Sequence, residues 1–348
     1  MATEIIITFF KTIFCFVMLS TVYLAIMVKA HSLKAKGNEM LNKYYYKFKY
    51  TIIVHVTESF NWTKLLTSLQ EQDYQNFNVL FVVSKNAKIP ETINLKKYRI
   101  FENCILESKL EILDYVVNII KPDTEAIAYI KGNCVIEKDF ISNINNMFNK
   151  GFDVTQCNIL KSNSSKLHSA KGNFRNLIER KNRVNAGLSS TIAEQGFVIK
   201  LSVLKLLDLS PSKFDDDKKL QSNLIMYNNS IGYADSAKLI DNTEVTTTNT
   251  SIFHLKQSML LFYYYYLGLK ILCNGINTQN FDKINFGANY MRPPVIVMSL
   301  LCVGVLYLTL YVEHSFTFFS FICIITFIMM LFLTFNSKLK QIGSFQTA

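Results

Sequence analysis

Apolar residues gather in three long runs near the two ends of the chain. Residues 5–28 contain a single charged side chain, Lys11, and residues 295–312 and 315–335 contain none. About 20 apolar residues suffice for a helix to cross a bilayer, and a lysine near the end of such a helix can reach the interface. Only a Glu-His pair separates the last two runs. The pattern predicts one spanning helix near the N-terminus and a tight spanning hairpin near the C-terminus.

A cleaved signal peptide is the other interpretation of residues 5–28. The run is longer than the usual apolar core of a signal peptide, about 7–15 residues, and no small-x-small cleavage site follows it. These two features favour a retained anchor.

Basic residues flank the predicted spans on one side. Cytoplasmic flanks are enriched in Lys and Arg, and all the flanks agree if the N-terminus is outside and the C-terminus inside. The flanking residues are Lys29, Lys34, Lys36, Arg292, Lys338 and Lys340. We therefore expect a multi-pass protein of the plasma or inner membrane with its main domain in the cytoplasm. The expected segments are an anchor (5–28), a main domain (29–252), interfacial amphipathic helices (253–292), a spanning hairpin (295–335) and a cytoplasmic tail (336–348).

Short apolar runs alternate with helical patterns in the main domain. The predicted strands are 49–57, 77–83, 126–130, 152–159 and 195–200, and the predicted helices are 62–73, 107–120, 138–149, 174–186, 201–208 and 216–229. Such alternation is typical of an α/β fold with a doubly wound, mostly parallel sheet. Ligands bind such sheets beyond the carboxyl ends of the strands, so the loops after residues 57, 83 and 130 are the expected site.

The charge balance narrows the expected partners. The chain carries 37 Lys and Arg against 26 Asp and Glu, a net charge of +11, of which the end segments hold only +1. The remaining +10 suits an anionic membrane surface or a nucleotide diphosphate, or it is simply a solvated basic face. Nucleic acid is not an expected partner. Seven cysteines without a CxxC pair and five scattered histidines predict reduced thiols and no metal cluster.

Four segments in order resemble the family 2 glycosyltransferases. They are residues 50–83, with a "SL..Q.Y.N"-like helix end, and AYIKGNCVIEKDFI (128–141), GFVIKLSVLKLL (196–207) and residues 214–245, which begin FDDD. The resemblance covers about residues 50–260. It implies a GT-A fold, a nucleotide-sugar donor, and a membrane-anchored architecture like that of cellulose and hyaluronan synthases, which also end in paired spanning helices.

The donor-pocket positions implied by this resemblance lack the acidic residues of the family. The expected positions are Thr57, Ser84, Lys85, Lys131 and Asn133. Where the family has aspartates that hold a divalent metal, this chain has Ser-Lys-Asn after the second strand and Lys-Gly-Asn after residue 130. A protonated lysine cannot be a metal ligand, and carboxylates are what Mg²⁺ and Mn²⁺ need here. We therefore expect no metal site and no cofactor.

Two further family elements are changed or ambiguous. The closing Gln-x-x-Arg-Trp motif of the family is missing from this chain, and its nearest remnants are Lys256 and Gln257. The resemblance places Asp217 at the general-base position, with Asp216 where the family has glutamate. The alternative is that these acidic residues cap the following helix, whose N-terminal dipole favours negative charge. His55 either lines the donor pocket or is simply packed.

Two functions remain open. The first is a catalytically degenerate glycosyltransferase homologue that acts as partner or regulator of an active synthase in cell-surface glycan biosynthesis. The second is an active inverting transferase that uses Lys85 and Lys131 in place of a metal to hold the diphosphate. Changes at three separate motifs favour the first. The aromatic stretch 263–266 suits a helix at the lipid headgroup level, although a carbohydrate-stacking surface is the alternative.

Overall fold

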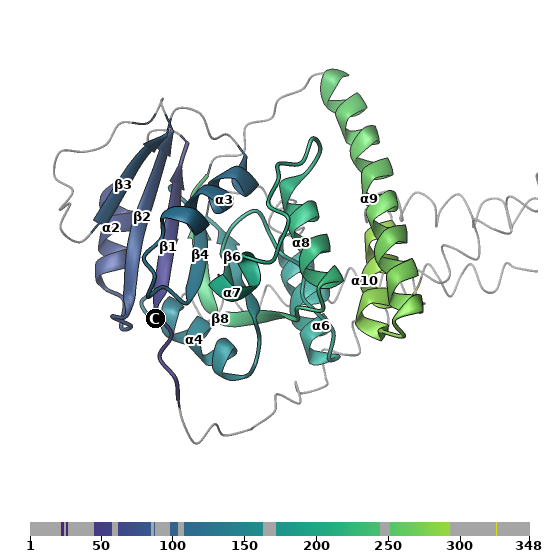
Figure 1. Ribbon diagram of the computed structural model, residues 1–348, viewed down its shortest axis with the longest axis horizontal. Coiled ribbons are helices and arrows are strands. Elements are labelled where there is room, and N and C mark those ends of the chain that lie inside the picture. Colours follow the sequence, from purple (N-terminus) through teal and green to yellow (C-terminus); the bar gives the residue numbers. More distant parts are fainter. Residues whose placement is uncertain are drawn as a thin grey trace, which may run out of the picture.

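An eight-stranded sheet with the strand order β3-β2-β1-β4-β7-β6-β8-β5 organises the chain (Figure 1). It is seen in a computed structural model, which describes residues 45–57, 62–84, 87, 98–103, 108–162, 172–243 and 251–292, together with 22, 23, 26 and 325. Four of the seven ladders between neighbouring strands are parallel. The expected mixed α/β architecture with a mostly parallel sheet is therefore observed.

The first half of the sheet is entirely parallel. It contains β1 (Tyr50–Val56), β2 (Phe77–Ser84), β3 (Tyr98–Asn103) and β4 (Ala126–Lys131), with helices α2 (Trp62–Gln70) and α3 (Lys109–Ile119) as connections. All seven residues of β1 are buried, as a central strand covered on both faces requires. Strands 49–57, 77–83 and 126–130 were predicted within a residue or two. The strand β3 was not predicted.

The second half of the sheet is mixed, which corrects the doubly wound expectation. It contains β5 (Cys134–Ile136), β6 (Val154–Lys161), β7 (Phe197–Lys200) and β8 (Ile231–Asp241), with β7 antiparallel to both β4 and β6. The accompanying helices are α4 (Phe140–Asn149), the π-helical η2 (Arg175–Lys181), α6 (Asn182–Asn185), α7 (Leu201–Leu204) and α8 (Asp216–Met226). A buried strand has the same hydrophobic pattern in either direction, so the sequence did not reveal the reversal of β7.

Successive residues of the central strands point to opposite faces and build two apolar layers. Ile52 and Val54 pack with α2 and α4 on one face, while Ile53 packs with α3, α7 and α8 on the other. The period of two in the strands and the spacing of Leu65 and Leu69 on α2 account for this division. The second layer continues into the C-terminal helices.

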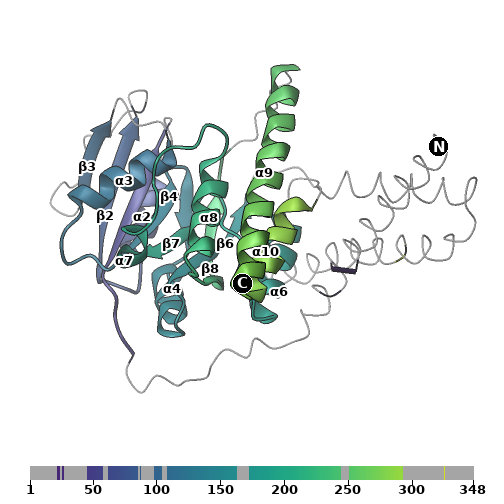
Figure 2. The ribbon, with the colours of Figure 1, turned by 45° about the vertical axis from the view of Figure 1, so that its right-hand side comes forward.

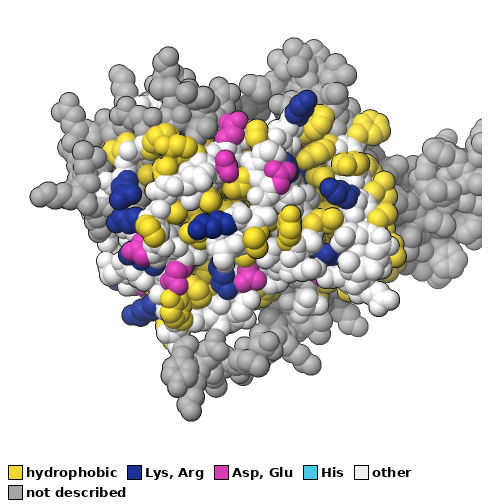
Figure 3. Space-filling view, in the orientation of Figure 1, with side chains coloured by type: hydrophobic (Ala, Val, Ile, Leu, Met, Phe, Trp, Pro, Cys, Tyr) yellow, Lys and Arg dark blue, Asp and Glu magenta, His cyan; other side chains and the backbone are white. Residues whose placement is uncertain are grey.

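Two antiparallel helices, α9 (Ser251–Asn277) and α10 (Phe281–Met291), lie on the far side of α8 from the sheet (Figures 1 and 2). Their backbones approach closely because glycines face each other: a Cβ at Gly287 would lie 2.6 Å from the carbonyl oxygen of Gly268. Hydrophobic side chains gather over α9 (Figure 3), and the most exposed include Phe262, Tyr266 and Leu269. The segment is helical as expected, and its place at the membrane interface stays a prediction.

No helix within the described ranges is long and apolar enough to cross a membrane. The predicted spans 5–28 and 295–335 and the tail 336–348 lie outside the described residues, apart from residues 22, 23, 26 and 325. The expected membrane topology therefore stays a prediction.

Candidate active site

The parallel strands bring the expected donor-pocket positions to one edge of the sheet. His55 of β1 is in register with Lys131 of β4, and Val56 with Val83 of β2, so Thr57, Ser84 and Lys131 follow neighbouring strand ends. The Ser84 hydroxyl donates a hydrogen bond to the Val56 carbonyl at 2.8 Å, which joins two of these ends. Lys85 lies outside the described residues.

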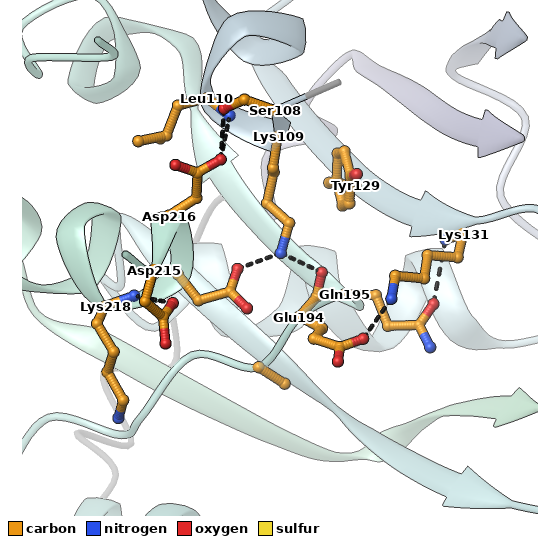
Figure 4. Close-up of polar contacts among 12 residues, drawn as sticks. Ser108, Lys109, Leu110, Tyr129, Lys131, Glu194, Gln195, Asp215, Asp216 and Lys218 are labelled. Atoms are coloured by element: carbon orange, nitrogen blue, oxygen red, sulfur yellow. Dashed lines mark hydrogen bonds and ion pairs between the residues drawn. The ribbon is translucent and has the colours of Figure 1, made fainter. Parts of the chain in front are cut away.

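Lys131 at the end of β4 is held by two residues that sequence reasoning missed. Its ammonium forms an ion pair with Glu194, and its backbone N–H donates to the Gln195 side-chain oxygen at 3.1 Å. In the turn that follows, the Asn133 carbonyl accepts a hydrogen bond from the backbone of Asn242 at 3.0 Å. Figure 4 shows Lys131 and Glu194 pointing toward each other. Lys131 is therefore already neutralised by this chain.

Lys109, at the start of α3, is the second basic residue at this edge. Its ammonium forms an ion pair with Asp217 and donates to the Glu194 carbonyl (Figure 4). It also lies 5.2 Å from the ring centre of Tyr129 and 5.5 Å from that of Phe197. The site thus contains two lysines and two carboxylates that form two ion pairs, so its net charge is zero.

The three consecutive aspartates before α8 have three different roles. Asp215 is the helix N-cap and accepts a hydrogen bond from the backbone N–H of Lys218 at 3.0 Å. Asp216 accepts from the Ser108 hydroxyl and from the backbone N–H of Ser212, so it ties α8 to the start of α3. Asp217 alone faces the strand edge. The expected acidic cap is thus provided by Asp215, while Asp216 and Asp217 lie in the first turn of the helix.

Burial and the two lysines set the protonation states of the acidic residues. Burial raises the pKa of Asp217 above its ordinary value, although Lys109 opposes the shift. Burial acts in the same direction on Glu194, but Lys131, Lys109 and Lys161 together outweigh it, so the pKa of Glu194 is lowered. Burial opposes the charged form of Lys131, but Glu194, Asp217 and Asp241 together outweigh it and raise the pKa of Lys131. Glu194 and Lys131 therefore stabilise each other's charged forms, whereas Asp217 is less well compensated.

His55 is a neutral, packed residue at neutral pH. Its Nδ1 lies 2.8 Å from the Tyr129 hydroxyl, and burial together with Lys131 and Lys109 lowers its pKa to about 4. The ring is 9% exposed. Between the two sequence interpretations, this geometry favours a packed histidine that fixes the Tyr129 hydroxyl.

The residues at this edge do not fit a divalent cation. In the part of the chain that the structure describes, no three His, Cys, Asp or Glu side chains are grouped so that they could hold a metal. The carboxylates of Asp217 and Glu194 face the edge, but each is bound by a lysine. A metal would have to displace both ammonium groups, which are themselves the cations of the site.

Lys256 and Gln257, the expected remnants of the closing motif, lie in the first turns of α9, where only the backbone is described.

Glu194 and Gln195, the two site residues that the sequence did not reveal, come just before β7. They reach the end of β4 because β7 runs antiparallel to it, with Phe197 opposite Tyr129. Polar residues before a short strand were the only sequence signal for them.

Comparisons with known proteins give structural likeness only. No family model and no curated protein matches the chain. Among solved structures, Staphylococcus aureus TarS 1–349 is 13% identical with a TM-score of 0.41 and covers 65% of this chain and 66% of its own. A second S. aureus TarS structure is 14% identical with a TM-score of 0.44, and the match covers 65% of this chain and 40% of that one. GalNAc-T7 with UDP, GalNAc and Mn²⁺ is 8% identical with a TM-score of 0.42, and the match covers 57% of this chain and 44% of that one.

The chain thus spans less than two thirds of each of these structures. Identities of 8–14% and TM-scores below 0.5 assign neither a family nor an activity to it.

Proposed function

We propose that this protein is a glycosyltransferase-like chain without its own sugar-transfer activity, and that it serves as a partner or regulator of an active synthase in cell-surface glycan biosynthesis. One observation carries the proposal. At the strand edge where a donor diphosphate and its metal would lie, Lys109 and Lys131 are bound by Asp217 and Glu194. A diphosphate therefore meets neither a metal nor a free ammonium group in this part of the site.

The electrostatic cost of opening the site supports the same conclusion. An anionic donor would have to separate the largely buried pair of Lys109 with Asp217 and leave that carboxylate beside its phosphates, whereas the pair of Lys131 with Glu194 is exposed and opposes the donor less. Removing one partner of a buried, hydrogen-bonded charge pair costs about 3–5 kcal/mol, and this cost applies to the first pair only. A transferase instead needs cations that are ready for the developing negative charge of the leaving group.

An active, metal-independent transferase is the second candidate, and one observation favours it. Asp217 faces the strand edge, and burial raises its pKa toward the range in which a carboxylate accepts a proton efficiently. In that case Lys109 and Lys131 would exchange their carboxylate partners for the diphosphate.

Direct transfer assays with the purified full chain distinguish the two candidates. We expect no transfer from a panel of radiolabelled UDP- and GDP-sugars to oligosaccharide or lipid acceptors. We also expect that deleting the chain reduces glycan output in cells, whereas Asp217→Asn at normal protein level does not. Sugar transfer that disappears with Asp217→Asn would establish the active enzyme. Affinity purification of the native chain tests the partner directly, and failure to retain a glycan synthase would contradict that role.

Membrane anchoring is part of the proposal. The apolar runs near both ends and the exposed aromatic side chains of α9 support it. We propose that the N-terminus is outside, the C-terminus inside and the main domain cytoplasmic. In a cysteine-free background, Ser315→Cys should react with an impermeant reagent in intact cells, and Ala186→Cys only after permeabilisation. External labelling at position 186 would overturn the cytoplasmic assignment.

A further inference from the structure

A second charged cluster lies where η2, α8 and α10 meet, and its charges do not balance. Glu179 accepts a hydrogen bond from Nη2 of Arg292 at 2.8 Å. Three more basic residues, Arg175, Arg180 and Lys218, act with Arg292 to lower the pKa of Glu179 even though burial raises it. Four positive charges thus surround one negative charge, which leaves a local excess of three.

The ammonium of Lys218 faces aromatic rings rather than a carboxylate. Its Nζ lies 4.6 Å from the ring centre of Tyr290 and 5.6 Å from that of Tyr264. Asp215 is another nearby acid, but one of its oxygens accepts the Lys218 backbone N–H and the other accepts the Tyr264 hydroxyl at 2.6 Å. Asp217 also attracts Lys218 but is paired with Lys109, so counting Asp215 as well leaves an excess of two positive charges.

Buried guanidinium groups in this cluster have donors without acceptors. The side chain of Arg292 is only 8% exposed, and its Nη1 has no hydrogen-bond partner among the residues that the structure describes. Arg180 is 5% exposed, and its Nε likewise has none among them. Leaving a buried charged donor unsatisfied is costly, so such groups normally have an acceptor. The unfilled donors of Arg292 therefore point to an anion.

The cluster is separate from the strand-edge site. Lys218 directly follows Asp217 on α8, but Figure 4 shows its side chain extending away from Lys109 and Glu194. On its far side, Arg292 lies over the rings of Tyr23 and Phe174, both at 5.9 Å. Tyr23 belongs to the first predicted span, and Tyr264 lies on α9, which carries the exposed aromatic side chains. The cluster therefore lies beside the segments expected at the membrane.

We propose that this junction binds a phosphate group, with Nη1 of Arg292 and Nζ of Lys218 as the donors to its oxygens. A phosphate monoester carries about −1.5 to −2 charges at neutral pH, which matches the excess of two. Arginine suits this role because its planar group offers several donors to one phosphate. The phosphate is either a free one or the headgroup of a lipid. The site does not depend on the function proposed above, because it holds no part of the strand edge.

Ligand-dependent thermal stability of the full-length, detergent-solubilised chain tests the site. The probes are inorganic phosphate and dihexanoyl phosphatidate, with chloride at matched ionic strength as the reference. A ligand that binds only the folded state raises the unfolding midpoint. We expect phosphate to raise the midpoint of the native chain and Lys218→Met to weaken phosphate binding at least tenfold. Lys219→Met is the matched control: it removes the same charge, but Lys219 pairs with Asp208 at 2.8 Å, away from the cluster.

A second variant that binds phosphate more tightly than the native chain shows that changes in this cluster do not act only through misfolding. Glu179→Gln removes the carboxylate that pairs with Arg292, so it should bind phosphate more tightly than the native chain. Tighter binding of phosphatidate than of inorganic phosphate by tenfold or more identifies a lipid headgroup, and equal binding identifies a free phosphate. The proposal is overturned if neither probe raises the midpoint, or if Lys218→Met and Lys219→Met respond alike.

Discussion

Lys109 on α3 and Asp217 on α8 form an ion pair beside the carboxyl end of β4, although 108 residues separate them in the chain. Both side chains are largely buried, at 11% and 23% exposed. The pair joins two helices that contact the same apolar layer, so it has a structural role whether or not the chain has catalytic activity.

Asp217→Asn should destabilise the fold without changing glycan output. The substitution leaves the buried ammonium of Lys109 with the Glu194 carbonyl but no charged partner, so we expect a loss of about 1–3 kcal/mol in the free energy of unfolding. Urea unfolding of the two single variants and of the double variant with Lys109→Met measures the coupling, which should reach about 1 kcal/mol. Asp123→Asn is the control, because its pair with Lys49 is exposed and should contribute much less to stability. Zero coupling would contradict the ion pair.

Stability should fall between neutral pH and pH 5 because of His55. The pKa of His55 is about 4 in the folded chain against 6.5 ordinarily, so the unfolded state binds more protons in this window. The stability that the neutral ring provides is present above pH 6.5 and is lost as the pH falls toward 4. We expect about 2 kcal/mol of this loss by pH 5, measured by urea unfolding. His55→Gln cannot bind this proton, so its stability should decrease less over the same range, and an equally steep decrease would contradict the assignment.

Mn²⁺ should not increase the affinity of the native chain for UDP or GDP. Asp217 and Glu194 are bound by lysines, and the β4–β5 turn offers Lys131 and Asn133 where a metal needs carboxylates. Titration calorimetry with and without Mn²⁺ measures this. The double substitution Lys131→Asp and Asn133→Asp also releases Glu194, so it should create measurable Mn²⁺ binding. Strong metal-dependent binding by the native chain would mean that acidic ligands come from elsewhere.

Gly287→Ala should separate α9 from α10. The added Cβ would lie 2.6 Å from the Gly268 carbonyl oxygen and 2.7 Å from the backbone nitrogen of Leu272, and neither backbone atom can move aside alone. Overpacking of this kind costs about 1–3 kcal/mol. Gly172→Ala is the control, since no atom lies within 4 Å of the position that its added Cβ would take. Thermal unfolding should show a lower midpoint for Gly287→Ala alone, and equal midpoints would contradict the close helix contact.

Sequence patterns alone were sufficient for three of the four strands in the parallel half of the sheet. Continuous apolar strands such as Tyr50–Val56 and the helical spacing of Leu65 and Leu69 are local signals, and the structure has these elements within a residue or two. The same patterns predicted that Thr57, Ser84 and Lys131 lie at one edge of the sheet, because the carboxyl ends of parallel strands meet there. The short edge strands β3 and β5 and the long β8 were not predicted, since their formation depends on pairing with distant segments.

The pairing of charges was decided only by the tertiary structure. The composition shows a basic chain, but it does not show that Lys109 meets Asp217, that Lys131 meets Glu194, or that Nη1 of Arg292 is left without an acceptor. Each of these arrangements depends on the direction of β7 or on the packing of α8 against α3 and α10. Hydrophobic periodicity is a local property and reports which face of an element is buried, whereas an ion pair depends on distances across the fold. Most helices and strands of this protein can therefore be predicted from local sequence patterns, whereas the chemistry of its site cannot.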